Sequence, residues 1–536
     1  MSTSGKSARG LIKNAGIVAG ATFLSRILGF VRDMVTANCL GTSIYADAFF
    51  VAFRIPNLLR RLFGEGSLTA AFIPVFSSYL AAGKREEARR VAQTAMTLTA
   101  LCLTLITVIG ILASPLIISL IAPGFAATPE KYELAVLLNR VMFPYILLIS
   151  LVALAMGILN ADNHFLTPAL APVLLNLCMI AAALGLSRPL GSPALALALG
   201  VLAGGLAQLA LQLPILKKRG FPWQPRTDFR HPAIIRVLQL MGPSLLGLAI
   251  TQITIFCNTL LASFLADGSI SYLYFADRLI QFPLGIFAVA LGSAVLPALS
   301  RAAAGADWED FSQTLSLALR LLIFIILPAM VGLIRLSRPI VYLLFQHGLF
   351  TAASTSMTAN TIVAYAVGLW AYAGIRVIVP AFHSLQDTKT PVKIGGLALL
   401  SNLVCAVVLM RFFDHLGLAL ATAIASAVNC LLLLLTLRKK LGREIRLEGC
   451  GRALLQTTLA CALMLGVIVL LDHWGPTAPA YTAHLPEIFK LLLKIGAGGL
   501  TYVLGARLLG NRELVVLGQI IKKRRQAKAA RARKNV

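Results

Sequence analysis

Charged residues are scarce in this chain, and their scarcity already excludes several classes of protein. Only 13% of its 536 residues are charged, whereas about 25% is typical of soluble proteins. Hydrophobic residues make up 58%, and the mean hydropathy is +0.83. A soluble enzyme and a disordered chain are therefore excluded. Uninterrupted apolar runs of about 18 residues or more recur from end to end, which indicates a polytopic membrane protein.

Cysteine and histidine are too few and too scattered to form the usual frameworks. The eight cysteines stand singly, without a CxxC pair or a Cys/His cluster, so neither a disulfide scaffold nor a metal site is indicated. HExxH, GxSxG and Walker motifs are also missing. We therefore expect no enzymatic activity, no bound cofactor and no direct use of ATP. Any transport would use facilitated flow, an ion gradient or the membrane potential.

Acidic residues are outnumbered by basic ones, 21 to 48, which gives a formal net charge of +27. Such a balance can indicate nucleic-acid binding, but most of these bases lie in short loops and in the tail from Lys522 to Lys534. Membrane topology places bases there, on the cytoplasmic side. We therefore expect no nucleic-acid partner, and we expect the tail to contact anionic membrane lipids.

The apolar runs predict an all-α fold with fourteen transmembrane helices. The run 44–80 is too long for one simple span, but dividing it would place the later basic loops outside, against the positive-inside rule. Counting it as one span puts both termini in the cytoplasm. The predicted spans are 15–38, 44–80, 91–121, 135–159, 167–187, 192–216, 236–263, 270–299, 312–337, 356–382, 391–411, 415–437, 450–471 and 486–510.

An internal repeat divides the predicted helices into two halves. The segment around Pro74 matches the one around Pro297, and Asp162 with Thr167-Pro168 matches Asp387 with Thr390-Pro391, at an offset of about 223 residues. This predicts two pseudo-symmetric six-helix bundles, 1–220 and 221–446, followed by 447–536 with two further helices and the basic tail. Parallel repeats of this kind are typical of transporters with a cavity between the halves. A duplication without transport, a channel and an intramembrane enzyme are all compatible with this pattern.

Ionisable residues inside the apolar runs are the strongest functional signal. A charge at the centre of a membrane helix costs about 2.5–3.5 kcal/mol on insertion scales, so each needs a partner or a water-filled cavity. Several of these charges are arginines, whose planar forks suit phosphate, and they favour an anionic, phosphorylated substrate. The alternative is a set of structural Arg–carboxylate pairs. The candidate residues are Arg26, Arg32, Asp33, Asp47, Arg60, Arg61, Glu65, Arg278 and Gln281.

Four strings carry a resemblance to a known family. They are SRILGFVRD at 25–33, ADAFFVAFRIPNLLRRLFGEG at 46–66, FADRLIQFP at 275–283 and QDTKTP at 386–391. The chain resembles the MurJ (MviN) lipid II flippases of the MOP exporter superfamily over essentially its whole length. The resemblance implies a fourteen-helix fold in the bacterial inner membrane, with helices 13 and 14 bordering a groove for a polyprenyl tail.

The resemblance also implies a substrate and a set of contacts. The substrate is lipid II, an undecaprenyl-diphosphate-linked precursor of peptidoglycan, carried to the outer leaflet by alternating access. Arg26, Arg32 and Arg278 would contact its diphosphate and sugar head. The supporting or gating residues would be Asp33, Asp47, Arg60, Arg61, Glu65 and Gln281.

Two departures and two rival functions accompany the resemblance. Family members often have Glu where this chain has Gln281, and the predicted seventh helix offers Thr251, Gln252 and Asn258 but no carboxylate for sodium. Sodium coupling is therefore doubtful. Another MOP-type exporter, of drugs or of a different polyprenyl-linked oligosaccharide, is the main alternative. A scaffold that recruits cell-wall enzymes is the second, and cell-wall or division proteins are possible partners.

Overall fold

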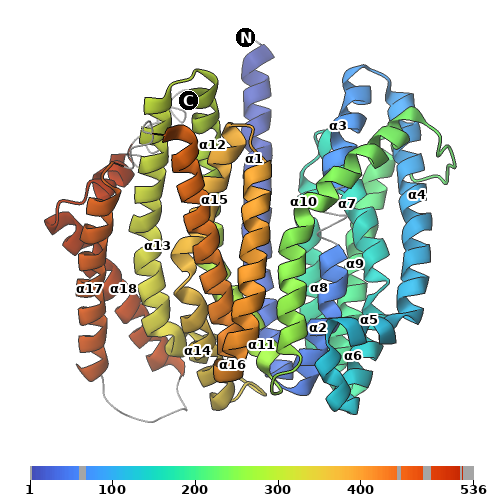
Figure 1. Cartoon of the computed structure of the whole chain (residues 1–536). Helices are drawn as coiled ribbons and strands as arrows, with labels where there is room; N and C mark the ends of the chain where they lie inside the picture. Colours follow the sequence, from blue (N-terminus) through green and yellow to red (C-terminus); the bar gives the residue numbers. More distant parts are fainter. Residues whose placement is uncertain (1–2, 60–67, 443–447, 475–483, 520–521, 523–536) are drawn as a thin grey trace. The chain divides into compact units, whose positions relative to one another are not determined.

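Every regular element in the described part of the chain is a helix (Figure 1). The computed structural model describes residues 3–59, 68–442, 448–474, 484–519 and 522. The helices are α1 (Thr3–Leu40), α2 (Ile44–Leu59), α3 (Leu68–Ala81), α4 (Arg85–Leu112), α5 (Ser114–Ile121), η2 (Pro123–Ala127), α6 (Pro129–Met142), α7 (Tyr145–Ala161), α8 (Leu166–Leu190), α9 (Pro193–Lys218), α10 (Pro232–Ala262), α11 (Ser269–Pro283), η3 (Leu284–Ala288), α12 (Val289–Ala304), α13 (Trp308–Phe345), α14 (Ala352–Ala366), α15 (Leu369–Ser384), α16 (Lys389–Leu441), α17 (Cys450–Trp474) and α18 (His484–Leu508).

The expectation of an all-α membrane protein is confirmed. Among the described residues, nine helical segments are long and apolar enough to cross a membrane, or ten if the bent pair α14 and α15 is one span. The exact number of fourteen spans stays a prediction. Within the run 44–80, the structure describes α2 and α3, and residues 60–67 between them lie outside the described part.

Two breaks divide long helical runs. The axes of α14 and α15 differ by 43° within the predicted span 356–382. In α16, Asp414 has a φ of +47°, at the place where the sequence predicts one span to end and the next to begin. Asn402 donates to the Thr422 hydroxyl at 3.4 Å, and a Cβ on Gly417 would lie 2.3 Å from the carbonyl oxygen of Leu409. The two parts of α16 therefore fold back on each other as a hairpin.

The chain forms two compact units. Unit 1 contains Met1–Ser271 and Phe345–Ser354, and unit 2 contains Tyr272–Leu344 and Thr355–Val536. The predicted boundary at 220/221 follows the internal repeat, which is a different criterion from compactness, so it stays a prediction. Unit 1 includes α10 because this helix packs along α3, with Ala233, Ile234 and Val237 in the same apolar core as Phe72 and Phe76.

Unit 2 places the last two long helices against α13. Residues Ala460, Met464 and Ile468 of α17 and Tyr502 of α18 share an apolar core with Phe324 of α13. Figure 1 shows α17 and α18 beside α13. The hydroxyl of Tyr502 donates to the carbonyl oxygen of Phe324 at 2.6 Å, so its polar end is satisfied inside this core.

Candidate functional site

Arg32 of α1 lies at the centre of a buried polar cluster in unit 1. Its Nε and Nη2 donate to Oδ1 of Asp33 at 3.1 and 2.7 Å, and its Nη1 donates to Oδ1 of Asn176 at 3.2 Å. Arg32 is 8% exposed, Asp33 4% and Asn176 6%. Asn176 belongs to α8 and also donates to the carbonyl oxygen of Ser25 at 3.1 Å. The amide of α8 thus holds the guanidinium of α1 in place.

Arg26 differs from Arg32 although both lie on α1. Its side chain is exposed. The seven-residue spacing of Arg26 and Asp33 places them on one helix face, but Asp33 bonds to its neighbour Arg32. Gly29 between them faces α8, where a Cβ would lie 3.6 Å from Nδ2 of Asn176, an ordinary contact distance. An alanine would therefore fit at this point.

Asp47 lies in a second buried cluster of unit 1. Its carboxylate accepts from Nζ of Lys131 at 2.9 Å, the backbone N–H of Gly268 at 2.8 Å, and the N–H and hydroxyl of Ser271 at 3.0 and 2.6 Å. Lys131 also binds the half-exposed Asp267 at 2.9 Å. Ser271 lies in the first turn of α11. The positive end of that helix dipole therefore also stabilises the negative charge of Asp47. The supporting or gating role predicted for Asp47 is untested by this geometry.

Arg54 is the remaining described charge of α2. Arg54 donates to the carbonyl oxygen of Ile255 at 3.3 Å and to the hydroxyl of Thr259, which joins α2 to α10. The candidates beyond it lie outside the described residues. These are Arg60, Arg61 and Glu65.

The candidate residues of unit 2 lie on α11. Arg278 donates to the hydroxyl of Tyr274 at 2.9 Å, and its guanidinium carbon lies 4.9 Å from the centre of that ring. The side chain of Gln281 bonds to Asp277: its amide nitrogen donates to Oδ2 of that residue at 3.0 Å. A glutamate at 281 could not donate in this way and would repel Asp277. Glutamine thus suits this chain, and Tyr274 supplies a partner for Arg278 that the charge pattern did not indicate.

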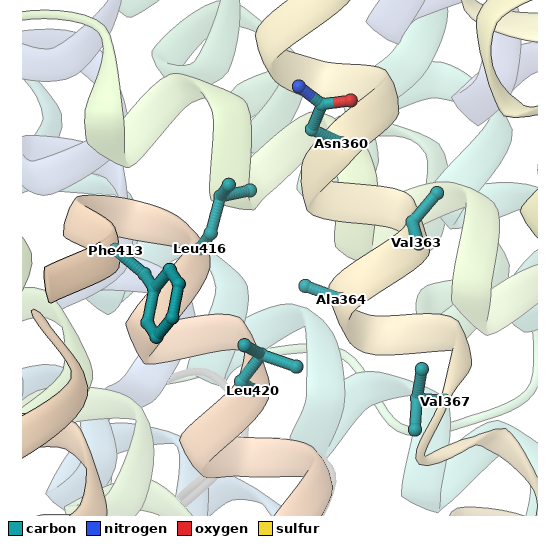
Figure 2. Close-up of a pocket in the computed structure, with 7 residues that line it drawn as sticks. All are labelled: Asn360, Val363, Ala364, Val367, Phe413, Leu416 and Leu420. Carbon is teal, nitrogen blue, oxygen red and sulfur yellow. The ribbon is translucent and has the colours of Figure 1, made fainter.

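Unit 2 also contains an apolar cavity of about 290 Å³ between α14 and the second half of α16 (Figure 2). Its polar lining comes from Asn360 alone. The other lining residues are Val363, Ala364, Val367, Phe413, Leu416 and Leu420. A cavity of this composition offers no charge to a phosphate, so it is not the site that the arginine pattern predicts.

The loops after α7 and α15 carry the two aspartates of the repeat. Asp162 lies between Nη2 of Arg85 at 3.5 Å and Nη1 of Arg219 at 3.3 Å. Asp387 binds Nζ of Lys440 at 2.8 Å and the hydroxyl and N–H of Thr390 at 2.7 and 3.0 Å. The hydrogen bonds from Lys440 and Thr390 hold the pKa of the Asp387 carboxyl well below its usual range. Asp162 thus joins the start of α4 to the end of α9, and Asp387 joins the start of α16 to its end.

Metal-binding residues do not converge in the described part of the chain, where no group of three His, Cys, Asp or Glu side chains could hold an ion. On α10, Gln252 is 9% exposed. The side chain of Thr251 lies outside what the structure describes.

Sequence reasoning missed Asn176 and Lys131. Asn176 is uncharged, so a search for ionisable residues in membrane helices does not find it. Lys131 falls between the predicted spans 91–121 and 135–159, outside the apolar runs, and its partner Asp47 lies 84 positions away. No local pattern links a lysine in the first turn of α6 to an acid in the first turn of α2.

Comparisons with known proteins agree with this arrangement of helices. The sequence model of the family described as "Lipid II flippase MurJ" matches residues 36–489. A probable lipid II flippase MurJ of Vibrio cholerae is 40% identical over 430 residues, which cover 79% of this chain and 82% of that protein. The lipid II flippase MurJ of Burkholderia cenocepacia is 37% identical over 461 residues, covering 85% and 88%.

Solved structures extend the comparison to the fold. A structure titled "Lipid II flippase MurJ, inward closed conformation" superposes with a TM-score of 0.77 and 30% identity, covering 93% of this chain and 99% of the other. An inward-facing MATE-family transporter of the MOP superfamily has a TM-score of 0.66 at 16% identity, covering 80% and 98%, and shows the fold alone. On the sequence matches and the superposition, this chain belongs to the MurJ family of lipid II flippases.

Proposed function

We propose that this chain translocates lipid II from the cytoplasmic to the outer leaflet of the bacterial inner membrane, for peptidoglycan synthesis and cell shape. The observation that carries the proposal is the family match over residues 36–489. Several arginines within its apolar helices agree with a diphosphate substrate. The activity is transport, without covalent chemistry. The MATE likeness concerns the fold, so it gives a drug-exporter function no separate support.

We propose Arg26, Arg32 and Arg278 as the groups that bind the diphosphate and sugar head. Arg26 is exposed and Arg278 half-buried, so both can reach a ligand. Arg32 is buried and donates to Asp33 and Asn176. Asp33 and Asn176 would orient Arg32 and release it when the phosphate enters.

The finer topology is part of the proposal. Fourteen spans, two six-helix bundles and two cytoplasmic termini follow from the loop charges, and alternating access between the bundles would carry the head group across. The polyprenyl tail would stay in the lipid beside helices α17 and α18. The cavity arginines would offset the desolvation of the diphosphate.

Energy and further partners stand as proposals too. We propose that no cofactor is bound and that the membrane potential or an ion gradient sets the direction; sodium remains the doubtful candidate. Contacts of the basic tail with anionic lipids are expected, and cell-wall or division proteins are expected as further partners of the chain. Apart from Lys522, the tail from residue 520 onward lies outside the described residues.

The test is rescue of bacteria depleted of their own flippase, scored as lipid II exposed on the outer leaflet. The wild-type chain should restore exposure, and Arg278→Ala or Arg32→Ala should reduce it at least about tenfold, because each variant removes a charge-assisted bond to phosphate. Arg188→Ala is the matched control, since Arg188 is exposed in the last turn of α8. Membrane levels are measured for every variant.

Two outcomes would count against the proposal in different ways. If the wild-type chain reaches the membrane but restores no exposure, the substrate is different. If the wild type works and both arginine variants work equally well, the head group is bound by other residues.

A further inference from the structure

The turn in the middle of α16 contains a histidine that the proposed transport does not use. His415 directly follows Asp414, where the two parts of α16 fold back on each other, and it is 7% exposed. We call residues 413–417 the α16 hairpin. In the predicted topology it lies on the outer side of the membrane. Histidine changes its charge near neutral pH, so the surroundings of His415 decide how this hairpin responds to acid.

Two other helices of unit 2 enclose the His415 ring. Its centre lies 4.9 Å from that of Tyr272 on α11, and its side chain donates a hydrogen bond to the carbonyl oxygen of Met357 on α14. The ring nitrogen Nε2 is buried and has no hydrogen-bond partner among the described residues, so the donor is Nδ1. A neutral ring with its proton on Nδ1 has no N–H at Nε2, whereas an imidazolium would have one there without an acceptor.

The groups that face His415 offer little compensation for a positive charge. Asp414, its neighbour in sequence, is the charged side chain that interacts with it electrostatically. From α11 the titratable group is the phenol of Tyr272, and α14 contains no Asp, Glu, Lys or Arg. Arg411, one turn earlier on α16, is exposed. In the closed hairpin, an imidazolium would therefore have one carboxylate nearby and an unpaired, buried N–H, which is costly.

The backbone of the α16 hairpin is strained and tightly closed. Asp414 has a φ of +47° and a ψ of −129°, close to the values of the first central residue of a type II′ turn, which glycine usually occupies. A residue with a side chain is disfavoured in this conformation and persists there only when its surroundings hold it. At Gly417 a Cβ would lie 2.3 Å from the carbonyl oxygen of Leu409, so the closed hairpin has no room for a side chain at that position. Opening the hairpin would relieve the strain at Asp414.

The α16 hairpin also forms part of one wall of the apolar cavity in unit 2 (Figure 2). Phe413 and Leu416, on either side of Asp414 and His415, line the cavity from α16, and Val363 lines it from α14. Met357, the hydrogen-bond partner of His415, lies on the same helix as Val363. Loss of the bond between His415 and Met357 would therefore separate the two walls at this end of the cavity.

We propose that the α16 hairpin is a pH-sensitive element, closed against α11 and α14 while His415 is neutral and opened when His415 takes up a proton. In the open form, water can accept from the N–H at Nε2, and Asp414 can leave its strained conformation. The contact with α14 and the wall of the cavity are lost together. The proposal goes beyond the flippase function and does not depend on it.

The sign of the pH dependence follows from where the proton binds. The open form binds one proton more than the closed form, so acid favours opening and neutral or basic pH favours closure. The population of the open form rises as pH falls below about 6.5, the value at which an exposed histidine titrates. A single proton limits this rise to about tenfold per pH unit.

The experiment is hydrogen–deuterium exchange of the purified full-length chain in nanodiscs, followed by mass spectrometry of peptides that cover the α16 hairpin. Rates measured between about pH 8 and pH 5 are divided by the intrinsic exchange rate at each pH, which leaves the opening equilibrium. We expect opening to be constant above about pH 7 and to rise up to about tenfold per pH unit below about 6.5. Peptides from the buried helix α7 of unit 1 provide the internal reference.

Two variants of His415 keep the test informative if one of them loosens the hairpin. His415→Gln removes the titrating group and keeps a polar side chain, and His415→Phe keeps an aromatic ring against Tyr272. Both should lose the pH dependence, whatever their exchange rate at pH 8. The matched control is His383→Gln, because His383 is exposed in the last turn of α15 and should leave the pH dependence of the hairpin unchanged. Asp414→Gly should reduce opening at pH 8, since glycine adopts a positive φ without steric cost.

Three results would overturn the proposal. The first is opening of the wild-type hairpin that stays constant or decreases on acidification. The second is a wild-type pH dependence that persists in both His415→Gln and His415→Phe, which would assign it to a carboxylate such as Asp414. The third is loss of the dependence in His383→Gln. Each readout is hydrogen exchange at the hairpin, so failure here is distinguishable from failure of the flippase proposal.

Discussion

The two units neutralise the charges inside their apolar helices in different ways. In unit 1, Arg32 with Asp33 and Asp47 with Lys131 are all less than 10% exposed, and each pair has further hydrogen bonds. In unit 2, Asp277 and Arg278 are only partly buried, as is Asp472 between Arg335 and Lys494. These two ion pairs of unit 1 are thus enclosed, whereas these charges of unit 2 are accessible.

This difference separates structural charges from charges that a ligand can reach. A buried ion pair loses little if both partners are replaced together, but removing one partner leaves an uncompensated charge. Accessible charges lack this constraint and gain most from an incoming anion. The Asp47–Lys131 pair of unit 1 is therefore expected to matter first for folding, and Arg278 of unit 2 first for substrate binding.

The largest effect is expected from Lys131→Met. This change leaves the carboxylate of Asp47 buried beside hydrogen-bond donors but without its cation, at a cost of about 3–5 kcal/mol. Thermal unfolding of the purified protein in detergent measures it. The control is Lys217→Met, since Lys217 is exposed at the end of α9. Adding Asp47→Asn should restore part of the lost stability.

A Lys131→Met protein as stable as the Lys217→Met control would break the comparison. It would mean that the bonds from Gly268 and Ser271 alone keep the Asp47 carboxylate stable. Unit 1 would then tolerate a buried carboxylate without its cation.

The sequence predicts the helices of this fold better than their contacts. Apolar runs bounded by polar residues are a local signal, and they predict the hairpin break near Asp414 as well as the long span of α13. Pairing across helices is not local. The seven-residue spacing places Arg26 and Asp33 on one helix face, yet Asp33 bonds to Arg32 because rotamers, and not helix faces alone, decide which groups meet.

The sequence also does not predict that α10 packs within unit 1. The repeat groups α10 with the second half, but its residues Ala233 and Val237 pack with Phe72 of α3. An apolar face does not specify which other apolar face it will cover. Of the candidate site, the arginines and acids could be listed from the sequence, whereas the neutral residues Asn176 and Tyr274 that position them could not.

An intermediate effect is expected from Asn176→Leu. This change tests whether Asn176 positions Arg32 for binding the substrate. The change removes the acceptor that holds Arg32, and a displaced guanidinium should lower lipid II exposure about tenfold in the depletion assay. The matched control is Gln208→Leu, because Gln208 is a buried amide that also bonds to α8, at the carbonyl oxygen of Ala171.

A second variant tests whether Asn176 acts through Arg32. In an Arg32→Gln background, Asn176→Leu should reduce exposure no further, because the group that it positions is already gone. If the two changes multiply, or if Gln208→Leu is equally harmful at normal membrane levels, Asn176 supports the packing of α1 on α8 and not the arginine.

The smallest effect is expected at Asp387, on the accessible side of the comparison. Its pKa is lowered in the folded protein by Lys440 and Thr390, so this contact stabilises the fold fully above the unfolded pKa of about 3.9. The contribution is lost as pH falls through the folded pKa. Asp387→Asn should therefore lower stability at pH 7, by about 1 kcal/mol or less because Lys440 is 45% exposed.

The sign of the pH dependence is the informative part of this last prediction. The difference in unfolding temperature between wild type and Asp387→Asn should shrink as pH is lowered from 7 toward 3, because protonation removes from the wild type the charge that the variant already lacks. Asp228→Asn, at an exposed aspartate without an ion pair among the described residues, should show no such trend. A difference that grows on acidification would mean that the Asp387 carboxyl is stabilised in its protonated form, and that the contact with Lys440 is not what holds the loop after α15.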